Sequence, residues 1–206
     1  MTKFINLHTH TFSNLSDVME VVNQYPWEFD ASVPNYSIGI HPWYIDENRL
    51  ETDLETIKQK LQLDKCLALG ECGLDKRIEI PLELQISVFK QQLELVKETQ
   101  KPIVLHCVAA YDEVIAIKKE MKMENPMIIH GFSKNEKVAQ SLLKNGFYLS
   151  FGKYLLRNPD LEKVFTFAPE NQILLETDTI EESIYQVYEK AAAIKGISVE
   201  EMKTIV

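Results

Sequence analysis

Every histidine in this chain of 206 residues closes a short apolar run. The five are His8, His10, His41, His106 and His130. Short apolar runs that stop at a polar residue are typical of strands buried in a parallel sheet. One histidine at a strand end is more often a structural residue than a ligand, but five in the same kind of position indicate a shared site.

The first apolar run ends in a His-x-His motif. Alternate side chains of a strand share a face, so His8 and His10 point the same way, roughly 7 Å apart along the strand. Two imidazoles in this arrangement form part of a metal site and need partners from elsewhere in the chain.

The remaining pattern predicts strands that alternate with helices. Eight strands are expected at residues 4–10, 18–23, 36–41, 66–71, 103–106, 127–130, 147–151 and 172–178. Apolar residues at helical spacing predict helices over 48–63, from Pro81 to before Lys101, and over 109–123, 135–145, 160–167 and 184–194. A last helix is expected after the capping box at Ser198.

Repeated β-then-α units predict a parallel sheet, and eight of them close into a TIM-type (β/α)8 barrel, here as a single domain over residues 1–206. An open doubly wound sheet is the alternative. The chain is shorter than the usual ~250 residues of a barrel, and only seven residues separate its first two strands. We therefore expect a distorted barrel with helices missing or shortened around strands 1 to 3.

Composition narrows the functional classes. The 31 acidic and 22 basic residues give a net charge of −9, which argues against a broad basic nucleic-acid-binding face. No apolar run approaches the ~20 residues of a membrane helix, and the first residues lack the apolar core of a signal peptide. The three cysteines have no Cys-x-x-Cys spacing for zinc. We expect a cytoplasmic protein without a membrane partner; a monomer is compatible with the sequence.

In a barrel the carboxyl ends of the strands form one face and carry the site. The polar residues at those ends are His8, His10, His41, Glu71, His106, His130 and Asp178. Neutral imidazoles with two carboxylates suit zinc, manganese, nickel or iron, whereas calcium prefers oxygen ligands alone. The number of candidates favours two ions, with Glu71 on the fourth strand able to bridge them.

The order of the motifs resembles the TatD-type metal-dependent hydrolases and deoxyribonucleases of the amidohydrolase superfamily, over nearly the whole chain. The motifs are His8-Thr9-His10, Gly39-Ile40-His41-Pro42, Gly70-Glu71-Cys72-Gly73-Leu74-Asp75, His106, His130-Gly131-Phe132-Ser133 and Glu176-Thr177-Asp178. Each motif alone is weakly specific, and their joint occurrence in this order is strongly specific.

The resemblance implies two divalent ions (zinc, manganese, nickel, iron or magnesium) with a divided set of ligands: His8, His10 and Asp178 on one, His106 and His130 on the other, and Glu71 between them. It places His41 beside the substrate rather than on metal, with packing against Pro42 and Trp43 as the alternative. Asp178 is expected to act both as a ligand and as acceptor of a proton from the attacking water.

The family resemblance also implies hydrolysis of a phosphodiester, and we expect a phosphoester substrate such as a DNA end. Basic residues on the loops after the site strands would then contact phosphate: Lys76, Arg77, Lys134, Lys153 and Arg157. Simple solvation of these side chains is the alternative reading for each.

Three departures from the family pattern keep other functions open. Phe12 stands where an Asp is usual, Cys107-Val108-Ala109 replaces Ser-Arg-Asp, and Thr179-Ile180 replaces Ser-Pro. Loss of the Arg removes a bidentate phosphate ligand. The alternative is an amide, lactone or ester hydrolase (a deacylase) at the same metals. A third reading, an inactive barrel that serves as a binding module, is disfavoured because six polar ligand groups are retained.

Overall fold

The computed structural model describes residues 2–206, which divide into two compact units. The central unit comprises residues 23–128, and the terminal unit comprises the segment up to Val22 together with Ile129–Val206. Hydrogen-bonded strands follow one another in chain order from β1 to β8, and the pairs within each unit are parallel. Such an order is that of a (β/α)8 barrel.

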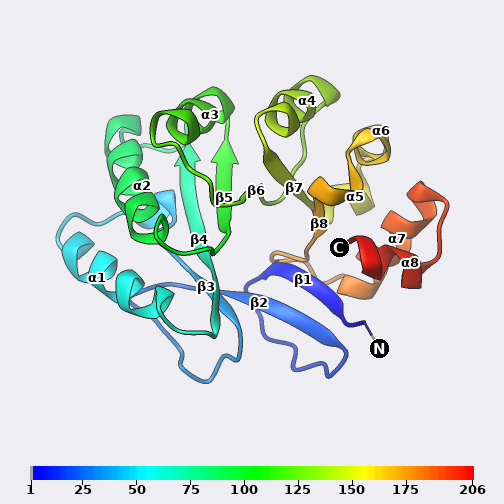
Figure 1. Cartoon of the computed structure of the whole chain (residues 1–206), viewed down its shortest axis with the longest axis horizontal. Coiled ribbons are helices and arrows are strands. Elements are labelled where there is room, and N and C mark those ends of the chain that lie inside the picture. The colour runs from blue at the N-terminus through cyan, green and yellow to red at the C-terminus, as the bar shows by residue number, and fades with distance from the viewer. Residues whose placement is uncertain (1) are drawn as a thin grey trace. The chain divides into compact units, whose positions relative to one another are not determined.

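The central unit holds three complete strands, each followed by a helix (Figure 1). Its elements are β3 (Tyr36–Ile38), η1 (Pro42–Tyr44), α1 (Leu50–Leu61), β4 (Cys66–Asp75), α2 (Leu82–Val96), β5 (Ile103–Val108) and α3 (Tyr111–Glu120). Helix α2 buries Val88, Phe89, Leu93 and Val96 on one side, beside β4. Complete burial of such side chains stabilises the fold by about 1.5–3 kcal/mol each.

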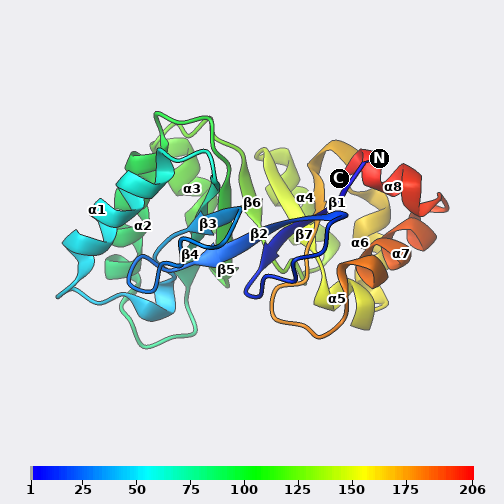
Figure 2. The same cartoon turned by 90° about the horizontal axis from the view of Figure 1, so that it is seen from below.

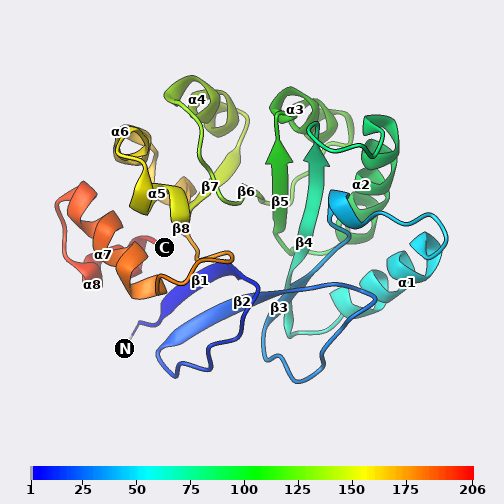
Figure 3. The ribbon, with the colours of Figure 1, turned by 180° about the vertical axis from the view of Figure 1, so that it is seen from behind.

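The terminal unit joins the two ends of the chain. It contains β1 (Phe4–Thr9), α4 (Glu136–Lys144), β7 (Phe147–Phe151), α5 (Lys153–Arg157), α6 (Asp160–Phe167), η2 (Glu170–Gln172), β8 (Ile173–Leu175), α7 (Ile184–Lys195) and α8 (Val199–Ile205). Figure 3 shows α7 and α8 folded back beside α5 and α6. The boundaries between the units fall inside β2 (Val18–Gln24) and β6 (Met127–Ile129).

Most of the predicted elements are confirmed. Within the described chain, no helix lies between β1 and β2 or between β2 and β3, so the expected gap in the helical layer is present (Figure 2). Three short elements were not predicted: η1, α5 and η2. Strand β4 runs four residues beyond the predicted end at Glu71, and β3 stops three residues before His41.

Side-chain amides of α2 explain both of these shifted ends. Gln85 accepts a hydrogen bond from the Asp75 amide at 2.8 Å and donates to the Asp75 carbonyl at 3.0 Å. Gln92 does the same for the backbone of Ile40, at 2.7 Å and 3.2 Å. Both glutamines are buried. The chain on either side of the site is therefore held by helix side chains in place of a strand partner.

Candidate metal-binding groups

A first group of ligand atoms lies in the terminal unit, where β1 meets the segment after β8. The Asp178 Oδ1 atom is 3.8 Å from His8 Nε2 and 3.5 Å from His10 Nε2. His8 is completely buried, whereas His10 and Asp178 are 27% and 28% exposed. Two imidazoles and a carboxylate within 4.8 Å of one another form a donor set suited to a divalent transition ion.

The backbone of Asp178 is fixed against β1. Its amide donates to the His8 carbonyl at 2.9 Å, and its carbonyl accepts from the His10 amide at 3.2 Å. The residue has φ 55°, in the left-handed region that Asp tolerates better than most residues. The hydrogen bonds to β1 hold this sparsely populated conformation and keep the carboxylate beside the two histidines.

His130 belongs to the same unit and is paired with a buried carboxylate. Its ring centroid lies 4.5 Å from that of His8, and its Nδ1 lies 3.4 Å from Glu176 Oε1. The Gly131 amide donates to the same oxygen at 2.7 Å. Burial alone would raise the pKa of Glu176, but the hydrogen bond and charge of His130, with the charge of His8, hold it below its usual range. Glu176 thus remains a hydrogen-bond acceptor for His130.

Glu176 was not predicted as a site residue. The signal was present in the Glu176-Thr177-Asp178 motif, because a carboxylate two positions before a ligand on an extended strand shares its face. The burial of Glu176 and its contact with a histidine 46 positions earlier in the chain depend on tertiary structure.

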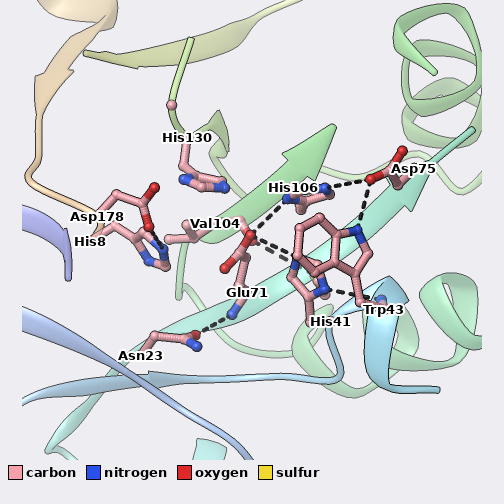
Figure 4. A network of polar contacts seen from close by, with 12 residues as sticks. His8, Asn23, His41, Trp43, Glu71, Asp75, Val104, His106, His130 and Asp178 are labelled. Carbon is pink, nitrogen blue, oxygen red and sulfur yellow. Dashed lines mark hydrogen bonds and ion pairs between the residues drawn. The ribbon is translucent and has the colours of Figure 1, made fainter. Parts of the chain in front are cut away.

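A second group lies in the central unit around Glu71. The Glu71 Oε1 atom is 3.1 Å from His41 Nε2 and 2.9 Å from His106 Nδ1 (Figure 4). The side chains of His41 and Glu71 are buried, and that of His106 is 13% exposed. Asn23 accepts a hydrogen bond from the Glu71 amide at 2.7 Å, which fixes the backbone at this position.

His41 is held by hydrogen bonds on both ring nitrogens. The Trp43 amide donates to His41 Nδ1 at 3.0 Å, so this nitrogen carries the lone pair of a neutral ring. The proton of the neutral ring is then on Nε2, which donates to Glu71 Oε1. With the proton on Nε2 His41 orients the carboxylate, and without it His41 joins Glu71 and His106 as a third candidate ligand. The expectation that His41 lies beside the substrate and does not bind metal remains a prediction.

His106 lies between two carboxylates of β4. Its Nδ1 faces Glu71, and its Nε2 is 3.3 Å from Asp75 Oδ2. Burial raises the pKa of Asp75, but hydrogen bonds from the Trp43 indole, from the Arg77 amide and from His106 outweigh it and leave the pKa below its usual range. Asp75 ends the Gly70-Glu71-Cys72-Gly73-Leu74-Asp75 motif and was not predicted as a site residue.

The predicted phosphate contacts are placed as follows. Lys76 forms an ion pair with Glu113, and Arg77 donates its backbone amide to Asp75 Oδ1. Arg157 pairs with Glu182 at 2.7 Å. Lys134 lines a groove of about 540 Å³ that also holds further lysines and acidic residues. The positive charges of Lys76 and Arg157 are therefore balanced by neighbouring carboxylates.

The sequence was compared with protein families and with curated proteins. The sequence matches the family described as TatD related DNase over residues 1–206. It is 34% identical over 169 residues to an uncharacterized metal-dependent hydrolase, YabD, of Bacillus subtilis, covering 80% of this chain and 63% of that protein. It is 31% identical over 146 residues to the 3'-5' ssDNA/RNA exonuclease TatD of Erwinia billingiae, covering 68% and 55%.

Solved structures show the same fold. The TatD homologue YJJV of Escherichia coli K12 has a TM-score of 0.83 at 22% identity, over 99% of this chain and 95% of that one. A TatD family hydrolase of Entamoeba histolytica has a TM-score of 0.82 at 17% identity, over 100% and 95%. The prediction of a TIM-type barrel is confirmed. The chain belongs to the TatD related DNase family of metal-dependent hydrolases.

Two further observations concern the extent of the match and the helices. The chain spans between 55% and 63% of the length of the first three curated relatives that it matches. Over the residues described by the structure, no helix is both long and apolar enough to cross a membrane.

Proposed function

We propose that this protein is a metal-dependent phosphodiesterase, with nucleic-acid ends as its substrate class. One observation carries the proposal: His8, His10 and Asp178 bring two imidazoles and a carboxylate within 4.8 Å of one another, a donor set suited to a divalent ion. Family membership supports it, as does the relative named a 3'-5' ssDNA/RNA exonuclease. We further propose that residues 1–206 act as one catalytic domain.

The proposed ligands of the first ion are His8, His10 and Asp178. For the second ion we propose His106 and His130, with Glu71 as the bridge, as the family resemblance implies. A bound divalent cation would supply Lewis acidity and lower the pKa of a coordinated water. The chemistry of the donor set fits such a cation, because every group is an imidazole or a carboxylate.

Asp178 is the best placed proton acceptor. It is the more exposed of the two proposed catalytic carboxylates, at 28% against 5% for Glu71. Water attacks phosphorus as its proton passes to Asp178 Oδ2, the phosphorus–oxygen bond breaks, and the departing oxygen is protonated from solvent. Glu71, held by the Nε2 proton of His41, keeps a fixed orientation throughout.

A second candidate function is hydrolysis of an amide, lactone or carboxylate ester at the same metals. The observation in its favour is that Lys76 and Arg157 are paired with Glu113 and Glu182 and so are not poised for phosphate.

The test uses the full chain purified without chelator and loaded with Mn²⁺ or Zn²⁺. Substrates are single-stranded DNA labelled at either end, a generic phosphodiester, an amide and a lactone. We expect stepwise shortening of DNA, with a loss of 10²–10⁴-fold in Asp178→Asn, as for removal of a general base. Glu120→Gln, an exposed carboxylate-to-amide change on α3, is the matched control. Turnover of the amide or lactone alone would replace the proposal by the second function.

A further inference from the structure

Asp75 is a buried carboxylate, 2% exposed, that the proposed chemistry leaves without a role. It ends β4, and both its backbone groups are held by Gln85. Its side chain accepts from the Trp43 indole at 2.8 Å on Oδ2 and from the Arg77 amide at 2.8 Å on Oδ1. Burial of a carboxylate is costly without such partners, so its place in the fold is closely specified.

The same Oδ2 atom is 3.3 Å from His106 Nε2 (Figure 4). His106 therefore has a carboxylate oxygen at each ring nitrogen, Glu71 at Nδ1 and Asp75 at Nε2. A neutral imidazole carries one N–H and can donate to only one of them. The other nitrogen presents a lone pair to a carboxylate oxygen, which is unfavourable unless a cation lies on that side.

The surroundings decide which nitrogen carries the proton. Asp75 receives hydrogen bonds from two fixed donors and is anchored at its backbone, so it is built as an acceptor and not as a metal ligand. Glu71, in contrast, belongs to the proposed ligand set. The arrangement with Nε2–H donating to Asp75 leaves Nδ1 directed at Glu71, where a metal ion would share the two groups.

We propose that Asp75 is a positioning residue that fixes the Nε2–H tautomer of His106 and so presents Nδ1 as the metal-binding atom. Carboxylates behind ligating histidines fix ring orientation and raise the basicity of the ligand. Trp43 contributes as well, because its indole N–H donates a hydrogen bond to the Asp75 oxygen that faces His106. The inference rests on the metal site of the proposed function and names no substrate.

The tautomer can be measured without activity. Long-range ¹H–¹⁵N correlation spectra of the full chain, in the metal-free and Zn²⁺-loaded states, separate Nε2–H from Nδ1–H imidazoles. We expect His106 as the Nε2–H tautomer in both states, with Nδ1 shifted by Zn²⁺. An Nδ1–H tautomer, or a Zn²⁺-induced shift at Nε2, would overturn the inference. This experiment needs only the wild-type chain, so a variant that fails to fold does not affect it.

The contribution of Asp75 to Zn²⁺ affinity is measured by titration against a competing chelator. All donors around Asp75 point at its oxygens, so Asp75→Asn must place an amide N–H₂ against one of them. We expect Asp75→Asn to weaken binding at the His106 site by 10–100-fold, the usual effect of removing such a partner. Glu120→Gln should bind as the wild type does. Equal affinity of a folded Asp75→Asn and the wild type would contradict the proposal.

The outcomes separate this inference from the proposed function. A wild-type chain that shows the expected tautomer and binds Zn²⁺, but leaves DNA intact, would refute the phosphodiesterase and retain the role of Asp75. A chain that degrades DNA, and in which Zn²⁺ binds His106 through Nε2, would retain the phosphodiesterase and refute the role of Asp75.

Discussion

Gly73, on β4 between Glu71 and Asp75, offers the sharpest test of how the strands position the site. The residue has φ 136°, a conformation that side chains of L-residues rarely adopt, and it lies opposite His106 in the register of β4 and β5. A Cβ atom built on Gly73 would lie 2.1 Å from the His106 carbonyl oxygen. Since that neighbour is backbone, Gly73→Ala can be accommodated only by moving the strand that carries His106.

The loss of stability expected for Gly73→Ala has two contributions. The unfavourable φ costs about 1–3 kcal/mol, and overpacking against a strand costs about 1–3 kcal/mol more. We therefore expect Gly73→Ala to lower the free energy of unfolding by roughly 2–6 kcal/mol, a large share of a typical ~5–15 kcal/mol. Because His106 moves with β5, metal affinity should fall as well. Urea denaturation gives the first quantity and Zn²⁺ titration the second.

Gly196 provides the matched control. It caps α7 with φ 69°, and a Cβ there would have nothing within 4 Å. Gly196→Ala therefore carries only the conformational penalty, about 1 kcal/mol, and should leave metal binding unchanged. If Gly73→Ala proved no more destabilising than Gly196→Ala, the close approach of β4 and β5 would not be a constraint on the site.

Two other substitutions test buried hydrogen bonds away from the metals. Tyr188 accepts from the Ile5 amide at 3.0 Å and donates to its carbonyl at 3.2 Å; Tyr188→Phe should cost about 1–3 kcal/mol in urea denaturation. Burial raises the pKa of Tyr188 to about 12, so its contribution is complete below pH ~10 and is lost as the pH rises toward 12. Unfolding curves at these pH values should show a smaller alkaline loss in the variant. Asn125 is buried and donates to three backbone carbonyls at 2.9–3.3 Å, so Asn125→Ala should cost about 1–3 kcal/mol. Asn145→Ala removes a hydrogen bond at the surface, to the Ser141 carbonyl, and should cost under about 0.5 kcal/mol.

The sequence predicted those parts of the structure that depend on local pattern. The strands are short apolar runs, and the helices carry apolar residues at regular spacing, so both could be read from neighbouring residues. His8, His10 and Asp178 were expected together, and the structure groups them. The grouping of His41 with Glu71 and His106, and of His130 with His8, depends on strand register and on loops, which local pattern does not determine.

Charge pairing was the least predictable feature. Lys76 was expected to face substrate, yet it pairs with Glu113 on α3, a residue 37 positions later in the chain. Nothing in the local sequence of either residue indicates this contact. A lysine on a loop beside a site can bind the substrate or form an ion pair within the fold. Only the packing of the following helix decides between these two roles.

Neutral amides explain why the site residues sit where they do. Thr177, next to Asp178, donates its backbone amide to the Asn6 side chain at 3.0 Å, just as the Glu71 amide donates to Asn23. The glutamines of α2 hold the backbones of Ile40 and Asp75 in the same way. Strand ends have backbone groups that no ladder satisfies, and leaving them buried and unpaired costs about 1–3 kcal/mol each.

Each amide therefore does two things at once. It satisfies a backbone group at a strand end, and it fixes the position of a carboxylate or histidine at that residue or the next. An amide carries no charge, so it can be buried this close to the ligand atoms without competing for a cation or altering the charge of the group. The geometry of the metal-binding groups thus depends on uncharged residues that a search for ionisable side chains does not find.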